Sequence, residues 1–123
     1  MTSPFLKPEP LTHEAFLPFG DLISAENCTD IRSINEGHTV RFNNLANLAL
    51  KATGLAPCLS IFRSAAWLLP HKVHALERHP LTSQAFIPLG QSPYLIVVAP
   101  PGPLLESHIQ AFIGQPGQGI NYH

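Results

Sequence analysis

The chain has 123 residues, of which 45% are hydrophobic and 12% are charged, and its formal net charge is −1 at pH 7. This length fits one domain, spanning 1–123, which can bury a core without disulfide bonds. The near-neutral charge and the lack of a basic run argue against nucleic acid and anionic membrane surfaces as partners. Charged residues usually make up about 25% of a chain, so we expect part of this surface to be hidden in an oligomer.

The N-terminal stretch MTSPFLKPEPL is interrupted by prolines and has no apolar run of signal-peptide length. No segment of the sequence is apolar for long enough to cross a bilayer. Cys28 and Cys58 are widely spaced and form no CxxC pattern. We therefore expect a cytoplasmic protein with reduced thiols, and Cys58, within CLSIF, is expected in the core.

Two short segments have helical features. Residues 12–17 (THEAFL) begin with Thr12, a good N-cap, and Pro18 ends the segment. Residues 104–111 (LLESHIQA) could form two turns. Neither segment is long enough to form a helix that is stable without packing.

Most of the remaining chain is typical of short strands. Residues 38–42, 58–63, 84–89 and 94–99 are rich in β-branched or aromatic side chains and lie mostly between turn-forming residues. The short link GQSP suggests that 84–89 and 94–99 pair as an antiparallel hairpin. Many short strands with Pro and Gly turns indicate an all-β barrel or sandwich.

The segment 71–80 (HKVHALERHP) concentrates three histidines and a glutamate. In an extended chain Glu77 and His79 point the same way, whereas His74 needs a turn or bulge to join them. Such a set could bind a divalent metal or provide acid–base catalysis, because histidine titrates near neutral pH. A solvated polar edge that happens to be rich in histidine is the alternative.

The segment 114–123 (GQPGQGINYH) contains a second set of polar side chains after a glycine-rich turn. In a strand, Asn121 and His123 share one face, and Ile120 and Tyr122 occupy the other. The segment could be an ordinary hairpin. Together with 71–80, it could instead form the polar mouth of a small barrel.

Four blocks closely resemble the ureidoglycolate lyase family. They are LTHEAFLPFGDLI near the start, HALERHPLTSQAFIPL at 74–89, the IVVAPPGP region, and QAFIGQPGQGINYH. The resemblance implies a cupin-like antiparallel β-barrel with one or two short helices, usually a homodimer. It also implies cleavage of the C–N bond of ureidoglycolate to glyoxylate and urea (amidine-lyase chemistry) in allantoin and purine degradation, with a divalent metal such as nickel.

The resemblance also implies roles for particular residues. The family pattern HxLERHP matches His74, Glu77, Arg78 and His79, the pattern NYH matches Asn121, Tyr122 and His123, and an arginine in a strand matches Arg63. We expect four of these as catalytic residues and metal ligands: His74, Glu77, His79 and His123. Arg63, Asn121 and Tyr122 are expected to bind substrate, with Arg63 pairing its carboxylate. Arg78 is expected on the surface.

The family continues after NYH with a segment containing Trp-His-His-Pro and several more strands. We therefore expect this chain to lack the C-terminal segment of the family and its barrel to be incomplete at that end. Three alternatives to a metal-dependent lyase are open. One is acid–base catalysis by the same residues without a metal. The second is a catalytically silent cupin-like protein that binds a small carboxylate or only packs as a subunit. The third is a metal-dependent isomerase or dioxygenase-type cupin, which would share the barrel but form a different product.

Overall fold

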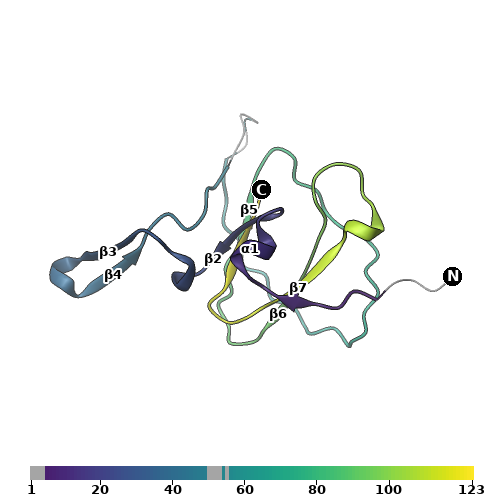
Figure 1. The fold of residues 1–123 in the computed structure, drawn as a ribbon, viewed down its shortest axis with the longest axis horizontal. Coiled ribbons are helices and arrows are strands. Elements are labelled where there is room, and N and C mark those ends of the chain that lie inside the picture. Colours follow the sequence, from purple (N-terminus) through teal and green to yellow (C-terminus); the bar gives the residue numbers. More distant parts are fainter. Residues whose placement is uncertain (1–4, 50–53, 55) are drawn as a thin grey trace.

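The computed structural model describes residues 5–49, 54 and 56–123 (Figure 1). The strands are β1 Glu9–Pro10, β2 Gly20–Ile23, β3 Ile31–Ile34, β4 Thr39–Phe42, β5 Gln84–Phe86, β6 Tyr94–Val98, β7 Gln110–Gly114 and β8 Gly119–Tyr122. The helix α1 spans His13–Phe16, and 3₁₀ turns cover Ala25–Asn27, Asn35–Gly37 and Glu106–His108. The predicted all-β class is confirmed. In the described residues no helix is both long and apolar enough to cross a membrane.

Two three-stranded sheets share one hydrophobic core (Figure 1). The first sheet has the order β1-β7-β6, and the second has the order β2-β8-β5. Strand β7 is the central strand of the first sheet, and β8 is the central strand of the second. The turn between β7 and β8 leads from one sheet into the other. Closure into a cupin-like barrel stays an expectation. The buried core side chains are Leu11, Phe16, Phe19, Leu22, Ile96, Val98, Phe112 and Ile120.

The predicted helix at 12–17 is confirmed as the single turn α1. The hydroxyl of Thr12 accepts a hydrogen bond from the backbone N–H of Ala15 at 3.2 Å, as expected for an N-cap. The helix ends before Pro18, and Phe16 is fully buried against Phe112 with ring centroids 5.6 Å apart. This packing stabilises a turn that would be too short to persist alone.

Strands β3 and β4 form a two-stranded arm that projects from the body (Figure 1). Only the second strand was predicted, at 38–42. The arm is tied at its base by Asp30, which accepts hydrogen bonds from Arg32 at 2.9 and 3.0 Å and from the Asn43 amide at 2.8 Å. All residues of both strands are exposed.

The predicted hairpin between 84–89 and 94–99 is wrong. Both strands exist, as β5 and β6, but β5 pairs with β8 and β6 pairs with β7. Pro88 and Pro93 lie in the connection and have no N–H to continue a ladder between the two strands. The connection therefore links the two sheets instead of closing a hairpin.

Three further predictions are corrected. Residues 58–63 form no strand, and Cys58 is exposed. A β-branched and aromatic composition does not form a ladder without a neighbouring strand. Residues 104–111 form no α-helix, because only Glu106–His108 make a 3₁₀ turn before β7 begins. Strand β7 lies between β1 and β6, and pairing on both sides overrides the weak helical propensity.

Candidate functional site

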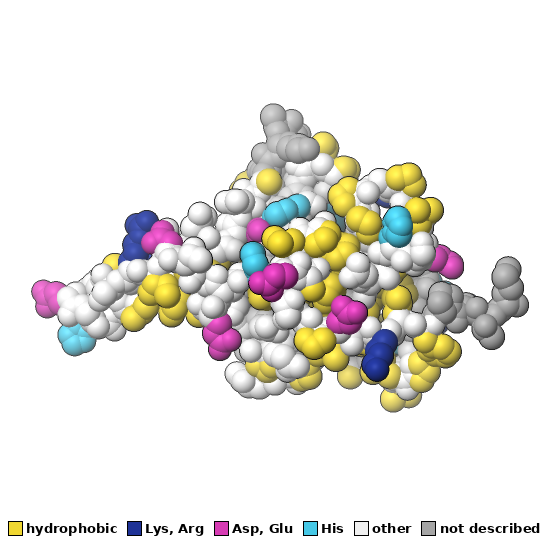
Figure 2. All heavy atoms as spheres, viewed as in Figure 1, with side chains coloured by type: hydrophobic (Ala, Val, Ile, Leu, Met, Phe, Trp, Pro, Cys, Tyr) yellow, Lys and Arg dark blue, Asp and Glu magenta, His cyan; other side chains and the backbone are white. Residues whose placement is uncertain are grey.

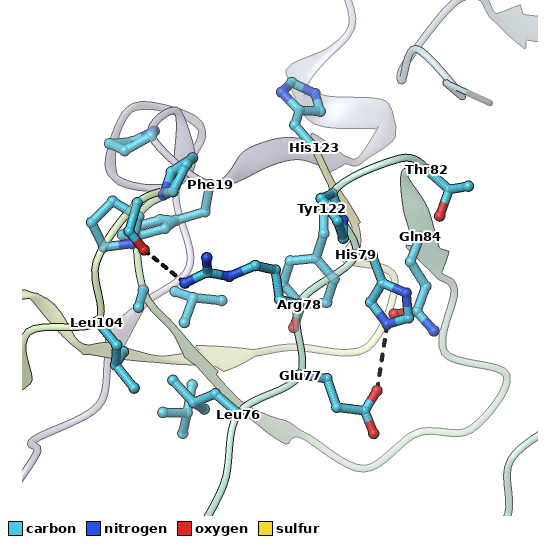
Figure 3. Close-up of a pocket in the computed structure, with 18 of the residues that line it drawn as sticks. Phe19, Leu76, Glu77, Arg78, His79, Thr82, Gln84, Leu104, Tyr122 and His123 are labelled. Atoms are coloured by element: carbon cyan, nitrogen blue, oxygen red, sulfur yellow. Dashed lines mark hydrogen bonds and ion pairs between the residues drawn. The ribbon is translucent and has the colours of Figure 1, made fainter. Parts of the chain in front are cut away.

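A pocket of about 540 Å³ is lined by the segment 76–80 together with residues of β5, β6 and β8 (Figure 3). Five polar or ionisable side chains from the two predicted segments line it: Glu77, Arg78, His79, Tyr122 and His123. Apolar lining comes from Phe19, Phe86, Val98 and Leu104. The structure thus brings together residues that lie more than forty positions apart in the sequence.

Glu77 and His79 point the same way, as the strand parity predicted. The Nε2 atom of His79 lies 3.4 Å from Oε2 of Glu77 (Figure 3). The carboxylate is 86% exposed and the imidazole 42% exposed, so both groups are open to solvent and to a ligand. The pair can therefore exchange a proton with a bound molecule.

Arg78 is exposed, as expected for a surface or interface residue, and it also lines the pocket. Its guanidinium Nη2 donates a hydrogen bond to the carbonyl of Gly102 at 2.7 Å (Figure 3). This bond holds a long side chain across the pocket while leaving other N–H groups of the guanidinium for a carboxylate. Within the described part of the chain, no other Lys or Arg lines the pocket.

His123 is anchored to Asp21 of β2. Its Nε2 atom lies 2.9 Å from Oδ2 of Asp21, and its backbone N–H donates to the carbonyl of Phe19 at 3.2 Å. Burial raises the pKa of Asp21, but hydrogen bonds from Asn121, His123 and Asn47 outweigh this effect and the pKa is lowered overall. Asp21 is therefore an ionised acceptor at neutral pH.

The buried side chain of Asn121 donates a hydrogen bond to the Asp21 carboxylate. It is completely buried, and its amide donates at 3.0 Å both to Oδ2 of Asp21 and to the carbonyl of Asn47. As predicted, Asn121 of β8 and His123, the residue after β8, lie on the same face of the chain, since both contact Asp21. Asn121 is outside the pocket lining. Its Oδ1 is buried and finds no hydrogen-bond partner within the described residues.

Tyr122 occupies the opposite face of β8, as predicted. Its ring packs against Phe86 and Phe16, with centroids 5.7 and 6.1 Å apart, and the side chain also lines the pocket. Burial raises the pKa of Tyr122 to about 12, with a smaller contribution from Tyr94. The phenol is therefore protonated at neutral pH and can act as a hydrogen-bond donor.

Besides Asn121, two predicted site residues lie outside the pocket lining. Arg63 and His74 are exposed and are not among the residues that line the pocket. Sequence reasoning also missed Asp21 and Asn47 as partners of the NYH segment. The block PFGDLI contained the signal for Asp21, as one of only two aspartates in the chain.

Among the described residues, the donor groups of the site do not form a complete metal-binding set. Across residues 5–49, 54 and 56–123, no three His, Cys, Asp or Glu side chains gather closely enough to hold an ion. Instead there are two separate pairs, Glu77–His79 and Asp21–His123. Each pair offers fewer protein ligands than a typical zinc site has.

Comparisons with known proteins agree with the four blocks noted in the sequence. The model of the ureidoglycolate lyase family matches residues 3–123. This chain belongs to that family. It is 48% identical over 114 residues to a ureidoglycolate lyase of Burkholderia mallei (strain NCTC 10229), covering 93% of this chain and 66% of that protein.

Two Pseudomonas relatives give a similar picture. Over 116 residues the chain is 49% identical to a ureidoglycolate lyase of Pseudomonas fluorescens (strain Pf0-1) and 48% identical to one of Pseudomonas syringae pv. syringae (strain B728a). These matches cover 94% of this chain in each case, and 69% and 68% of the relatives, respectively. The chain therefore spans about two thirds of the length of these curated relatives.

Proposed function

We propose that this chain acts as a ureidoglycolate lyase, which cleaves the C–N bond of ureidoglycolate to give glyoxylate and urea in allantoin and purine degradation. Family membership and relatives of that name support the proposal. The observation that carries it is the pocket in which Glu77, Arg78 and His79 meet Tyr122 and His123. Both segments belong to the blocks that resemble the family most closely.

The reaction moves one proton and breaks one bond. A base takes the proton from the substrate hydroxyl, the oxygen forms the aldehyde carbonyl of glyoxylate, and the C–N bond electrons pass to the urea nitrogen, which is then protonated. No water is consumed. We assign the base to His123 and the proton donor to His79, whose ring is oriented by Glu77 at 3.4 Å.

The substrate carboxylate needs a cationic partner in the same pocket. Among the residues that the structure describes, Arg78 is the only Lys or Arg that lines the pocket, and a guanidinium can form a bidentate pair with a carboxylate. We therefore propose Arg78 for this role, which the sequence had given to Arg63. The phenol of Tyr122 would donate to a substrate oxygen.

A divalent metal, nickel by resemblance to the family, stays part of the proposal. When bound, it would polarise a substrate oxygen as a Lewis acid. The groups in the pocket that could hold it are the imidazoles of His79 and His123 and the carboxylate of Glu77. Because no three donors gather in the described part of the chain, no step above is routed through it.

A homodimer in the cytoplasm completes the proposal. Hydrophobic side chains are spread over the visible face of the body and the arm, whereas Lys and Arg side chains are sparse there (Figure 2). Large apolar groups such as Leu59 and Trp67 are 102% and 73% exposed. An interface between two copies would cover such groups. Both cysteines are free thiols, as is usual in the reducing cytoplasm.

Product analysis tests the proposed function. The purified chain should convert ureidoglycolate to equal amounts of glyoxylate and urea, measured separately, with no release of ammonia. A catalytically silent binding protein would release neither product above the uncatalysed rate. Sedimentation analysis of the same preparation tests the dimer, which a single species of monomer mass would contradict.

A further inference from the structure

Three donors converge on one oxygen of Asp21. Its Oδ2 accepts from His123 Nε2 at 2.9 Å, from the Asn121 amide at 3.0 Å and from the Asn47 backbone N–H at 3.3 Å. An ionised carboxylate only accepts hydrogen bonds, so the imidazole nitrogen facing it must carry the proton. In the neutral ring the lone pair is then on Nδ1.

The position of Oδ2 is fixed by the buried amide of Asn121. That amide group also donates to the carbonyl of Asn47 at 3.0 Å, so its two acceptors determine which way the amide faces. Turning it over would place Asn121 Oδ1 against the carboxylate and the carbonyl. Asp21 itself lies within β2 and pairs directly with Asn121 of β8. The acceptor therefore sits on paired strands and not on a loop.

We propose that Asp21 is the positioning residue of His123, holding the proton on Nε2 so that Nδ1 can accept the substrate proton at the pocket. The inference deepens the proposed function, because it needs His123 as the base. Asp21 is absent from the pocket lining and acts through His123 alone. Asn121 and Asn47 hold Asp21 in place by donating hydrogen bonds to its carboxylate. This role explains why the polar side chain of Asn121 is completely buried next to the site.

The direct test reads the tautomer of His123 without any need for activity. Long-range ¹H–¹⁵N spectra of the ¹⁵N-histidine-labelled chain, with His123 assigned from His123→Gln, should show the Nε2–H form of the neutral ring. Asp21→Asn should lose this preference, because an amide can donate to the ring as well as accept. An Nδ1–H form in the unsubstituted chain would overturn the proposal, even if the variant did not fold.

Kinetics supply the second test. Asp21→Asn should lower kcat by about 100-fold or more, because losing the carboxylate that fixes the tautomer of a base histidine can cost up to about 10⁴-fold, while KM changes much less. Asp30→Asn is the matched control. It changes the only other aspartate of the chain, which is also hydrogen-bonded, and it should leave kcat unchanged. An unaltered kcat in Asp21→Asn would refute the positioning role.

The two proposals fail in different ways. If the unsubstituted chain releases no glyoxylate and urea, the proposed function falls, and the tautomer alone decides whether Asp21 holds His123. If the chain is active but its His123 is an Nδ1–H tautomer, the proposed lyase function is supported and the positioning role of Asp21 is refuted.

Discussion

Gly20 lies against the backbone of Asn121, so closely that a Cβ at position 20 would overlap the Asn121 carbonyl oxygen. Its φ of +155° is also unfavourable for residues with a side chain. Replacing Gly20 by alanine should therefore disturb the pairing of β2 with β8 and destabilise the fold by about 1–3 kcal/mol. Denaturant unfolding measures this loss. Gly90→Ala is the matched control, since nothing lies within 4 Å of a Cβ there; equal stability of the two variants would refute the close approach.

Glu77→Gln should lower the rate of urea release by about 100-fold, as loss of an acid–base partner usually does. The side chain is 86% exposed, so the stability of the fold should not change. Stopped assays for urea and a thermal melt measure the two effects. Glu106→Gln, at an exposed position outside the pocket, should behave like the unsubstituted chain. Near-normal release by Glu77→Gln would remove Glu77 from the mechanism.

Arg78→Ala and Arg63→Ala distinguish the two candidates for the substrate carboxylate. Loss of a charged hydrogen-bond pair should raise KM about 10-fold or more in Arg78→Ala, since the ground state loses an interaction that the transition state shares. Arg63→Ala should leave KM unchanged, because Arg63 is outside the lining. The opposite result would restore the assignment predicted from the sequence.

Chelation tests the metal. If a divalent ion takes part, a preparation stripped by a chelator should lose urea release and regain it when nickel is added. Elemental analysis before and after stripping gives the metal content for each activity. Full activity in a metal-free preparation would leave acid–base catalysis by the same residues as the mechanism.

The raised pKa of Tyr122 predicts how the free energy of unfolding changes at alkaline pH. Its pKa is raised from 10.0 to about 12 in the fold, so its contribution is complete below pH 10.0 and is lost as pH rises toward 12. The reason is that the unfolded chain gives up the phenolic proton first. Tyr122→Phe should therefore lose less stability than the unsubstituted chain between these pH values in urea unfolding. Parallel loss in both proteins would show that Tyr122 is not buried as described.

Local periodicity predicted part of the site. The two-residue repeat placed Glu77 with His79, and Asn121 with His123, because neighbouring side chains of an extended chain alternate in direction whatever lies around them. The cap of α1 at Thr12 was equally local. Each of these predictions needed only residues within a few positions of one another.

Longer-range relationships were not predictable in this way. The hairpin between 84–89 and 94–99 was the simplest pairing for the sequence, yet both strands pair with partners later in the chain. The bond between Asp21 and Asn121 joins residues 100 positions apart, and no spacing rule indicates it. Arg78 is exposed as expected, but parity alone could not show that it also lines the pocket.

The separation between Asp21 and Asn121 also has a consequence for synthesis on the ribosome. Strand β2 emerges early, but its partner β8 is made about one hundred residues later. Until β8 is made, the edges of β2 and β5 that pair with it have no partner strand. Such unpaired edges are prone to association with other chains. The Asp21 carboxylate thus acquires Asn121 and His123 as partners only after β8 has left the exit tunnel, so the pocket beside β8 forms well after β2 has been made.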